Sequence, residues 1–329
     1  MAAATSEQRE KQAELQGLLC GVVQTLCTRL AKEDNGKAAL LQYADSTMEA
    51  LLRVLANPGQ AGGAAGAAVA AASVHEEAMQ AVGSVAIGVG RQFSKYMPSF
   101  YPYLKAGLLN HQEWQVCLTT VGVLTDVCDA VGDELAPYSD EIMNMLIHNL
   151  GSDAVHRSIK PQILSTFGDM ALSLGAKFEK YTEAVTRMLQ QAMQLSAAQA
   201  AQAALDDDLA DYNNELRMGI LEAYSGIFQG LPSGSAEGPL RADVPLILEF
   251  ANTIARDQAS EEYDELVVRA TVSLLGDMVT TVQGVGSLLA SQRGQDWEKL
   301  LSWVHESDAL GSDLDWAVNA ISGAVQAAA

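Results

Sequence analysis

The chain has 329 residues, with 41 Asp or Glu against 20 Lys or Arg, and its formal net charge is −21. This balance argues against a surface that binds nucleic acid or anionic lipid, because both need clustered Lys and Arg. Since 49% of the residues are hydrophobic and only 19% are charged, the chain can bury a core, and its charge favours a basic partner.

Amphipathic segments with apolar residues every three or four positions follow one another along the chain and predict helices. Paired helices are predicted over residues 7–56, 74–110, 111–150, 152–195, 210–258 and 260–307, with a partial closing repeat over 308–329. Two low-complexity segments, residues 56–73 and 195–211, are predicted to be flexible or partly helical insertions. No segment shows the sustained alternation of a strand.

A glycine-centred motif recurs in the first helix of several pairs, at Gly83, Gly122, Gly168 and Gly276. Gly83 and Gly122 are 39 residues apart, and Gly122 and Gly168 are 46 apart. A glycine inside a helix costs about 1 kcal/mol relative to Ala. Its recurrence at one place in the repeat predicts a close approach between neighbouring helices.

A second motif places a large apolar residue three positions before a Tyr, and it separates the two helices of three pairs. It occurs as Phe93 to Tyr96, Leu135 to Tyr138 and Phe178 to Tyr181. Two helices in a period near 40–47 residues are typical of HEAT and armadillo arrays. The sequence therefore predicts an all-α fold over residues 1–329, a HEAT-repeat α-solenoid built as a superhelix of antiparallel helix pairs.

The ends of individual helices are also marked in the sequence. Gly132 and Gly175 are expected to end first helices, where a left-handed residue costs glycine little. Asp140 is a candidate N-cap of the following second helix, and Gly151 is its expected C-terminal stop.

The sequence offers little for catalysis or metal binding. The four cysteines form no Cys-x-x-Cys pair and are expected to be buried core thiols of a reducing compartment. His148 and His156 are expected to be surface or capping histidines, and Gly284–Ser287 is only half of a dinucleotide fingerprint. We expect no enzyme activity, no cofactor, no metal and no membrane insertion.

Several longer stretches carry a family resemblance. The stretches are residues 74–79, 115–122, 149–164, 178–181, and 212–217 with 221–224. They resemble the C-terminal HEAT-repeat region of importin-β, the karyopherin-β nuclear import receptor, and they follow one another in the same order as in that family. The likeness is closest over residues 73–230. Because importin-β proteins are much longer, the resemblance implies a fragment, a truncated gene product or a shortened paralogue.

The resemblance implies a function and a set of partners. The partners are the basic arm of importin-α or another basic cargo segment, nucleoporin Phe-Gly repeats, and Ran GTPase, whose main contacts belong to N-terminal repeats absent here. The implied locations are the cytoplasm, the nucleus and the nuclear pore, with a chain that is monomeric apart from its partners. The alternative is a HEAT-repeat scaffold or adaptor without a transport role.

Charge and resemblance together suggest where a basic arm would bind. From Leu205 to Ala329 there are six Lys or Arg against twenty-one Asp or Glu. The second helices of a HEAT superhelix form its concave surface, and aromatic rings there can stack on Arg or Lys. The candidates are Asp140, Glu141, Asp243, Glu249, Glu298, Trp303 and Trp316. For any one of them, the alternative is a solvated surface acid or a core tryptophan.

Overall fold

The structure is a computed structural model that describes residues 6–33, 35–56, 65–232, 238–258, 264–307 and 311–328. Every regular element in these ranges is a helix, and the helices follow one another in pairs joined by short turns, so the predicted all-α fold class is confirmed. The helices divide into two compact units, Met1–Gln162 and Ile163–Ala329, which are described separately below.

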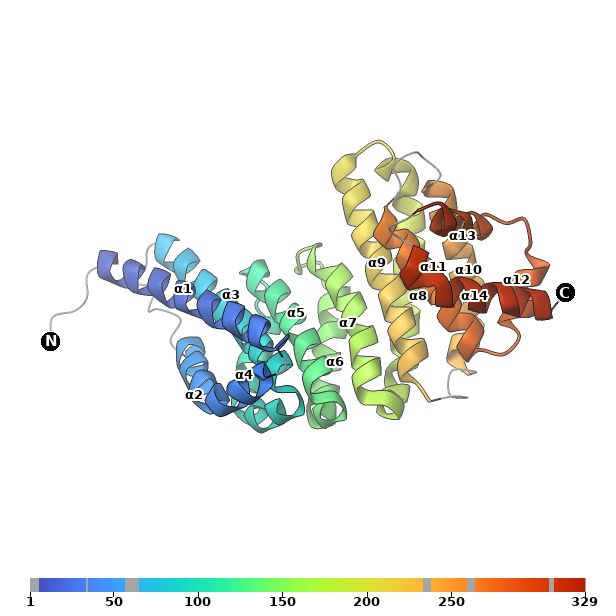
Figure 1. The fold of residues 1–329 in the computed structure, drawn as a ribbon. Helices are drawn as coiled ribbons and strands as arrows, with labels where there is room; N and C mark the ends of the chain where they lie inside the picture. The colour runs from blue at the N-terminus through green and yellow to red at the C-terminus, as the bar shows by residue number, and fades with distance from the viewer. Residues whose placement is uncertain are drawn as a thin grey trace. The chain divides into compact units, whose positions relative to one another are not determined.

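Unit 1 contains two rows of helices. Its complete helices are α1 (Ser6–Leu30), α2 (Gly36–Ala56), α3 (Ala65–Val89), α4 (Met97–Leu108), α5 (Trp114–Val131) and α6 (Ala136–Gly151). The first helices α1, α3 and α5 pack side by side, and α2, α4 and α6 form the second row (Figure 1). Helix α7 (Ile159–Leu174) starts at the end of this unit and continues into unit 2.

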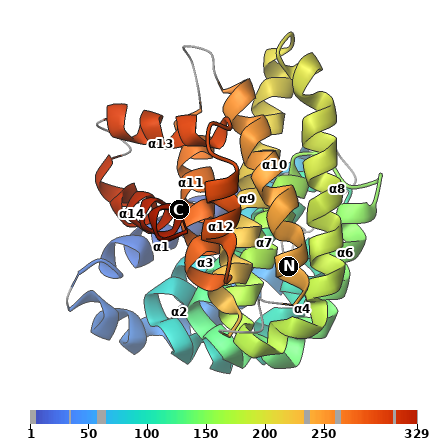
Figure 2. The same cartoon turned by 90° about the vertical axis from the view of Figure 1, so that its right-hand side faces the viewer.

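Unit 2 repeats the arrangement with one additional short helix. Its helices after α7 are α8 (Glu179–Ala203), α9 (Asp207–Gly230), α10 (Pro239–Asp257), α11 (Glu265–Thr281), α12 (Val285–Ser291), α13 (Trp297–Glu306) and α14 (Gly311–Ala327). Helices α7, α9, α11 and α14 form its first-helix row, and α8, α10 and α13 its second-helix row. The short α12 packs on α14 (Figure 2).

The predicted apolar-to-Tyr motif forms the same turn in each of three pairs. The turns are the 3-10 helices η1 (Gly90–Tyr96), η2 (Gly132–Leu135) and η3 (Gly175–Phe178). Each opens with a glycine at a φ of 54° to 59°, a backbone conformation that L side chains rarely adopt. Phe93, Leu135 and Phe178 are fully buried. Phe93 and Phe178 each meet the Tyr three residues on, edge to face, with ring centroids 5.7 Å apart. The motif therefore fixes the turn between paired helices.

The predicted ends of α6 are half right. Gly151, expected directly after the helix, is its last residue, so the predicted end is correct to within one residue. The helix begins at Ala136, directly after η2, so Asp140 lies inside it, and the prediction of Asp140 as the N-cap is wrong. Pro137 in the first turn was the better signal, because proline fits a position whose backbone N–H needs no partner within the helix.

The recurring glycines have the predicted packing role at three of four positions. A Cβ built at Gly168 would stand 2.7 Å from the Glu222 carbonyl oxygen, and one at Gly276 would stand 2.7 Å from the Ala317 Cβ. A Cβ built at Gly83 would clash with the Asp126 carboxylate of α5. A Cβ at Gly122 would meet nothing within 4 Å, so the close approach predicted there is wrong.

The two expected insertions are mainly helix where the structure describes them. Helix α8 runs to Ala203 and α9 starts at Asp207, so most of residues 195–211 extends the two helices. In the earlier segment, α3 already begins at Ala65, while residues 57–64 lie outside the described residues.

The cysteines and the most apolar stretch of unit 1 contribute to its buried core. All four cysteines of the chain are buried and free, as expected for core thiols. One stretch of the described residues, Trp114–Gly151, passes a length and composition test for a membrane span. It consists of two helices, α5 and α6, broken at Gly132, and 56% of its most apolar window is buried within the protein. Core packing therefore accounts for it.

Candidate partner-binding surface

The five acidic candidates were predicted on second helices, and the structure places all five there. Asp140 and Glu141 lie on α6 in unit 1. In unit 2, Asp243 and Glu249 lie on α10 and Glu298 and Trp303 on α13, which is its neighbour in the second-helix row. The surface therefore has one part in each unit, and each part is described by itself.

In unit 1, Asp140 and Glu141 are both exposed, but Glu141 has partners within its own unit. Its carboxylate accepts a hydrogen bond from the Tyr101 hydroxyl at 2.6 Å and pairs with the ammonium of Lys105. These bonds, the one from Lys105 first, lower the pKa of Glu141 and keep it ionised. A basic ligand would have to exchange with Lys105 to reach it.

Asp243 does not belong to a partner-binding surface, and its selection is corrected here. Its side chain is only 2% exposed. One carboxylate oxygen accepts from the Gln190 amide at 2.7 Å, and the other accepts from the Tyr224 hydroxyl at 3.0 Å. Burial raises the pKa of Asp243 against the opposing effect of these two bonds. Asp243 thus joins α8, α9 and α10 from within.

An exposed acid of α10 and a partly buried acid just before α13 form a small charged network with two cations. Arg256 pairs with Glu249 at 2.9 Å on its own helix and reaches Asp296, just before α13, at 3.8 Å. Lys299 pairs with the same Asp296 at 2.6 Å. Because surface pairs of this kind contribute about 0–1 kcal/mol each, an incoming Arg or Lys can exchange with them at little cost.

Glu298 and Trp303 stand beside this network on α13. Glu298 accepts a hydrogen bond from the Gly294 backbone N–H at 3.1 Å, which ties the preceding turn to the helix. Trp303 is half-buried on the same helix. Glu298 and Trp303 therefore share one helix of the second-helix row.

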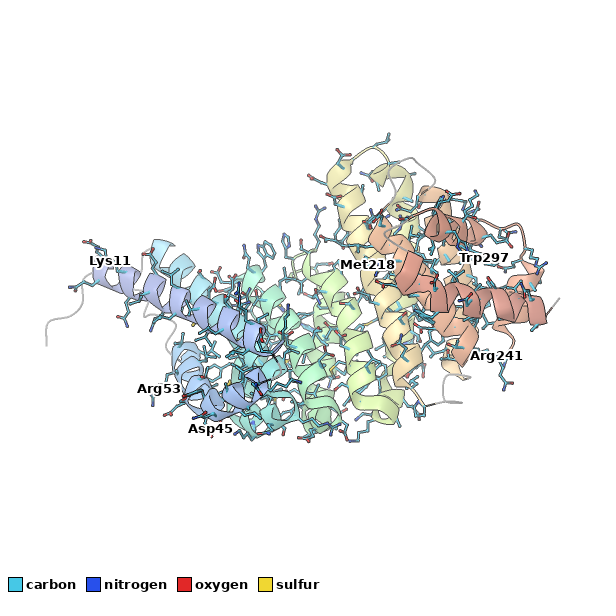
Figure 3. The ribbon with its side chains drawn as sticks, in the orientation of Figure 1. Lys11, Asp45, Arg53, Met218, Arg241 and Trp297 are labelled. Atoms are coloured by element: carbon cyan, nitrogen blue, oxygen red, sulfur yellow. The ribbon has the colours of Figure 1, made fainter. Side chains whose placement is uncertain are left out.

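The two remaining tryptophans of this region are Trp316, which was a candidate, and Trp297, which was not, and neither lies on the predicted surface. Trp316 is 46% exposed, but it lies on α14 against Gly276 of α11, in the first-helix row. The structure does not bring it together with Glu249 or Glu298. Trp297, labelled in Figure 3, is 2% exposed and belongs to the core. Its indole N–H donates to the Gln292 carbonyl at 3.3 Å.

Sites for chemistry are not evident in the part of the chain that the structure describes. No group of three or more His, Cys, Asp or Glu there is close enough to hold a metal ion. His156, a candidate surface or capping residue, stacks on Trp114 with ring centroids 4.3 Å apart. Its Nδ1 accepts from the Ser158 backbone N–H at 3.3 Å, which fixes a turn.

Repeated helix pairs and their shared glycine turns define a HEAT-type helical-repeat protein. Residues 2–293 match the family model described as importin subunit beta-1-like, TPR repeats. Importin subunit beta-1 of Arabidopsis thaliana is 41% identical over 320 residues, which are 97% of this chain and 35% of that protein. The chain belongs to the importin subunit beta-1 family.

Solved structures agree with this assignment. A crystal structure of importin beta, obtained in a polyethylene glycol condition, superposes with a TM-score of 0.82 at 28% identity, over 98% of this chain and 36% of that one. The Kap95:Nup1 complex has a TM-score of 0.77 at 22% identity, over 98% of this chain and 35% of that one, and supports the fold. The chain thus spans about a third of the length of these relatives.

Proposed function

We propose that the chain is a non-catalytic segment of a nuclear transport receptor that holds a basic segment of importin-α or of cargo at exposed acidic residues of its second-helix row. The observation that carries this proposal is family membership together with the excess of acid in unit 2. A charged disordered segment gains affinity by wrapping along a large complementary surface, which suits an array of this kind.

The charge excess supports long-range attraction of such a segment. From Leu205 to Ala329, twenty-one acidic residues stand against six basic ones. Even if every Lys and Arg in this stretch neutralised one acid, fifteen carboxylates would remain. The resulting negative potential concentrates a basic ligand near the surface and speeds its association.

The local geometry supports capture after the encounter. Glu249 is exposed, and its cationic partner Arg256 is itself half-exposed, so a guanidinium or ammonium of the ligand can replace Arg256. Glu298 is partly exposed on the neighbouring helix α13. The indole of Trp303 offers a face on which an Arg or the stem of a Lys can stack. Asp140 and Glu141 supply a second acidic position on α6.

We further propose that nucleoporins and Ran act on the longer receptor to which such a segment belongs. Kap95, whose fold this chain shares, has been solved in complex with Nup1. A receptor of this family would meet its cargo in the cytoplasm, cross the nuclear pore and release the cargo in the nucleus. These steps are proposals for the receptor, because this chain spans only about a third of its relatives.

The experiment is a titration of the purified chain into a fluorescent basic-arm peptide of importin-α, with a peptide of scrambled Arg and Lys positions as control. We expect saturable binding that prefers the native arm and weakens steadily with salt, since exposed charges are screened within about 10 Å at 0.1 M. Equal binding of the scrambled peptide, or none, in a chain shown to be helical by circular dichroism would contradict the proposal. That result would favour a HEAT scaffold without a transport role.

A further inference from the structure

An open pocket of about 230 Å³ lies in unit 2, lined by residues at the end of α8, the start of α9, the end of α10 and the start of α11. Figure 1 labels these four helices. Small alanine side chains from α8 and α9 leave the space open. The polar groups that line it are Asn213, Asn214, Arg217, Asp257, Gln258 and Asp264. The first three belong to residues 212–217, one of the stretches that carry the family resemblance.

Most of these polar groups already have partners within the pocket wall. Arg217, which is 3% exposed, donates from Nε to the Ser196 hydroxyl at 3.3 Å and pairs with Asp257. Gln258 donates to the Asn214 side-chain oxygen at 3.3 Å and accepts from the Asp264 backbone N–H at 2.6 Å. These bonds hold the wall in one arrangement, and Asp257 neutralises the one cation in it.

Asn213 is the exception among the polar residues of the wall. Its side chain is 2% exposed, and its Oδ1 atom has no hydrogen-bond partner. Buried polar atoms are nearly always paired, because water is lost on burial and must be replaced by another partner. A buried acceptor in the wall of an open pocket therefore points to a ligand that donates a hydrogen bond.

The charges around the pocket select the kind of donor. The wall carries the carboxylates of Asp257 and Asp264 against the single guanidinium of Arg217. Three further acids, Asp207, Asp208 and Asp211, are exposed in the first turns of α9. They lie outside the pocket wall, but on the helix that supplies Asn213 and Arg217 to it. A donor that is also positively charged is favoured here. The described residues hold no cluster of acidic, His or Cys side chains that would select a metal ion instead.

We propose that this pocket receives the guanidinium group of an arginine presented by a basic partner segment. Guanidinium carries five N–H donors in a planar fork, so one group can donate to Asn213 and to a carboxylate of the wall at the same time. A lysine ammonium is a compact point charge that lacks this flat geometry. The proposal rests on the proposed function, since it identifies one contact of the basic segment.

The test uses N-acetyl-arginine methylamide as a probe and the full chain as the protein. The side-chain amide signal of Asn213 is followed by nuclear magnetic resonance while the probe is added. The matching citrulline compound keeps the shape of arginine without its charge, and the matching lysine compound keeps the charge without the fork. We expect a saturable shift with arginine, and a shift at least several-fold weaker with either control compound.

The variant Asn213→Leu removes the unpaired acceptor while keeping a side chain of similar size. Its thermal midpoint should equal or exceed that of the wild type, because a buried unpaired polar group is lost. Its affinity for the arginine probe, measured by isothermal titration calorimetry because the variant lacks the Asn213 amide signal, should fall about tenfold, the effect of losing about 1.4 kcal/mol of binding free energy. Asn319→Leu, at an exposed position of α14 in the same unit, is the matched control and should leave affinity unchanged.

The outcomes separate this proposal from the proposed function. Unchanged affinity of the arginine probe in Asn213→Leu, or equal binding of the citrulline or lysine compound, overturns the arginine pocket. The basic-arm peptide would then still test the proposed function independently. Conversely, failure of that peptide to bind, with the probe still shifting Asn213, would remove the proposed function and leave the pocket in place.

Discussion

Helices α7 and α9 approach each other so closely that adding a single methyl group between them should force them apart. Gly226 of α9 faces Gly168 of α7, and a Cβ built at Gly226 would stand 2.5 Å from the Gly168 Cα and 2.6 Å from its carbonyl carbon and oxygen. Ordinary contacts between such atoms lie at about 3.5–4.0 Å. All three contacted atoms are backbone, so the clash cannot be relieved by turning a side chain.

Two opposing effects decide the stability of Gly226→Ala. Replacing a helical glycine with Ala gains about 1 kcal/mol of helix propensity. Overpacking a tight contact costs typically about 1–3 kcal/mol, and backbone contacts overlapping by about 1 Å belong at the upper end. We therefore expect a net loss of about 2 kcal/mol, which for a unit of this size lowers the thermal midpoint by about 4–8 °C.

Gly122→Ala is the matched control, because this glycine also lies inside a first helix. A Cβ there meets nothing within 4 Å, so only the propensity term remains and the variant should gain up to about 1 kcal/mol. Urea and thermal unfolding followed by helical circular dichroism would measure both variants. A Gly226→Ala chain as stable as the wild type, or a Gly122→Ala chain that is clearly less stable, would refute this account of the packing.

Two further predictions concern buried polar groups. Asn149 is fully buried, its amide donates to the Leu108 carbonyl at 2.7 Å, and its Oδ1 lies 2.9 Å from His111 Nε2. Asn149→Leu removes both contacts, so the free energy of unfolding measured in urea should fall by about 1–3 kcal/mol. Retained stability would contradict that role. Burial raises the pKa of Asp277 above its ordinary 3.8, so its contribution to stability should fall as pH rises from 3.8 through the folded-state value. Asp277→Asn keeps an oxygen that can accept from the Ser225 and Gln229 donors, but it has no carboxyl group to ionise. Its free energy of unfolding, relative to that of the wild type, should therefore rise with pH. A difference that stays constant with pH would contradict the raised pKa of Asp277.

The repeat architecture was readable from the sequence because its signals are local. Each turn between paired helices is determined by residues close together in the sequence. Examples are the turn glycines Gly132 and Gly175, and the buried Phe93 and Phe178, which follow such a glycine by three residues. Periodic apolar residues then fix which face of each helix is buried. These features predicted the all-α array without knowledge of any contact between distant residues.

The errors arose where the outcome depends on a neighbouring helix. Whether Gly122 meets another backbone, or whether Asp243 faces solvent or Tyr224, depends on the rotation and spacing of adjacent helices. Charge alone does not distinguish a buried acid that joins helices from an exposed one that binds a partner. The unpaired Asn213 could not be recognised for the same reason, although the stretch containing it was.

The central claim is that a basic segment binds the second-helix row of unit 2 and does not simply respond to net charge. The direct test compares two double variants with the same change in charge, Glu249→Lys with Glu298→Lys on the second-helix row and Glu215→Lys with Asp315→Lys at exposed positions on the first-helix row. Affinity for the fluorescent basic-arm peptide should fall about tenfold in the first variant, as expected for reversing the charge of one exposed and one partly exposed acid. It should stay within about twofold in the second, with helical circular dichroism unchanged in both. Equal loss in the two variants would contradict a site on the second-helix row.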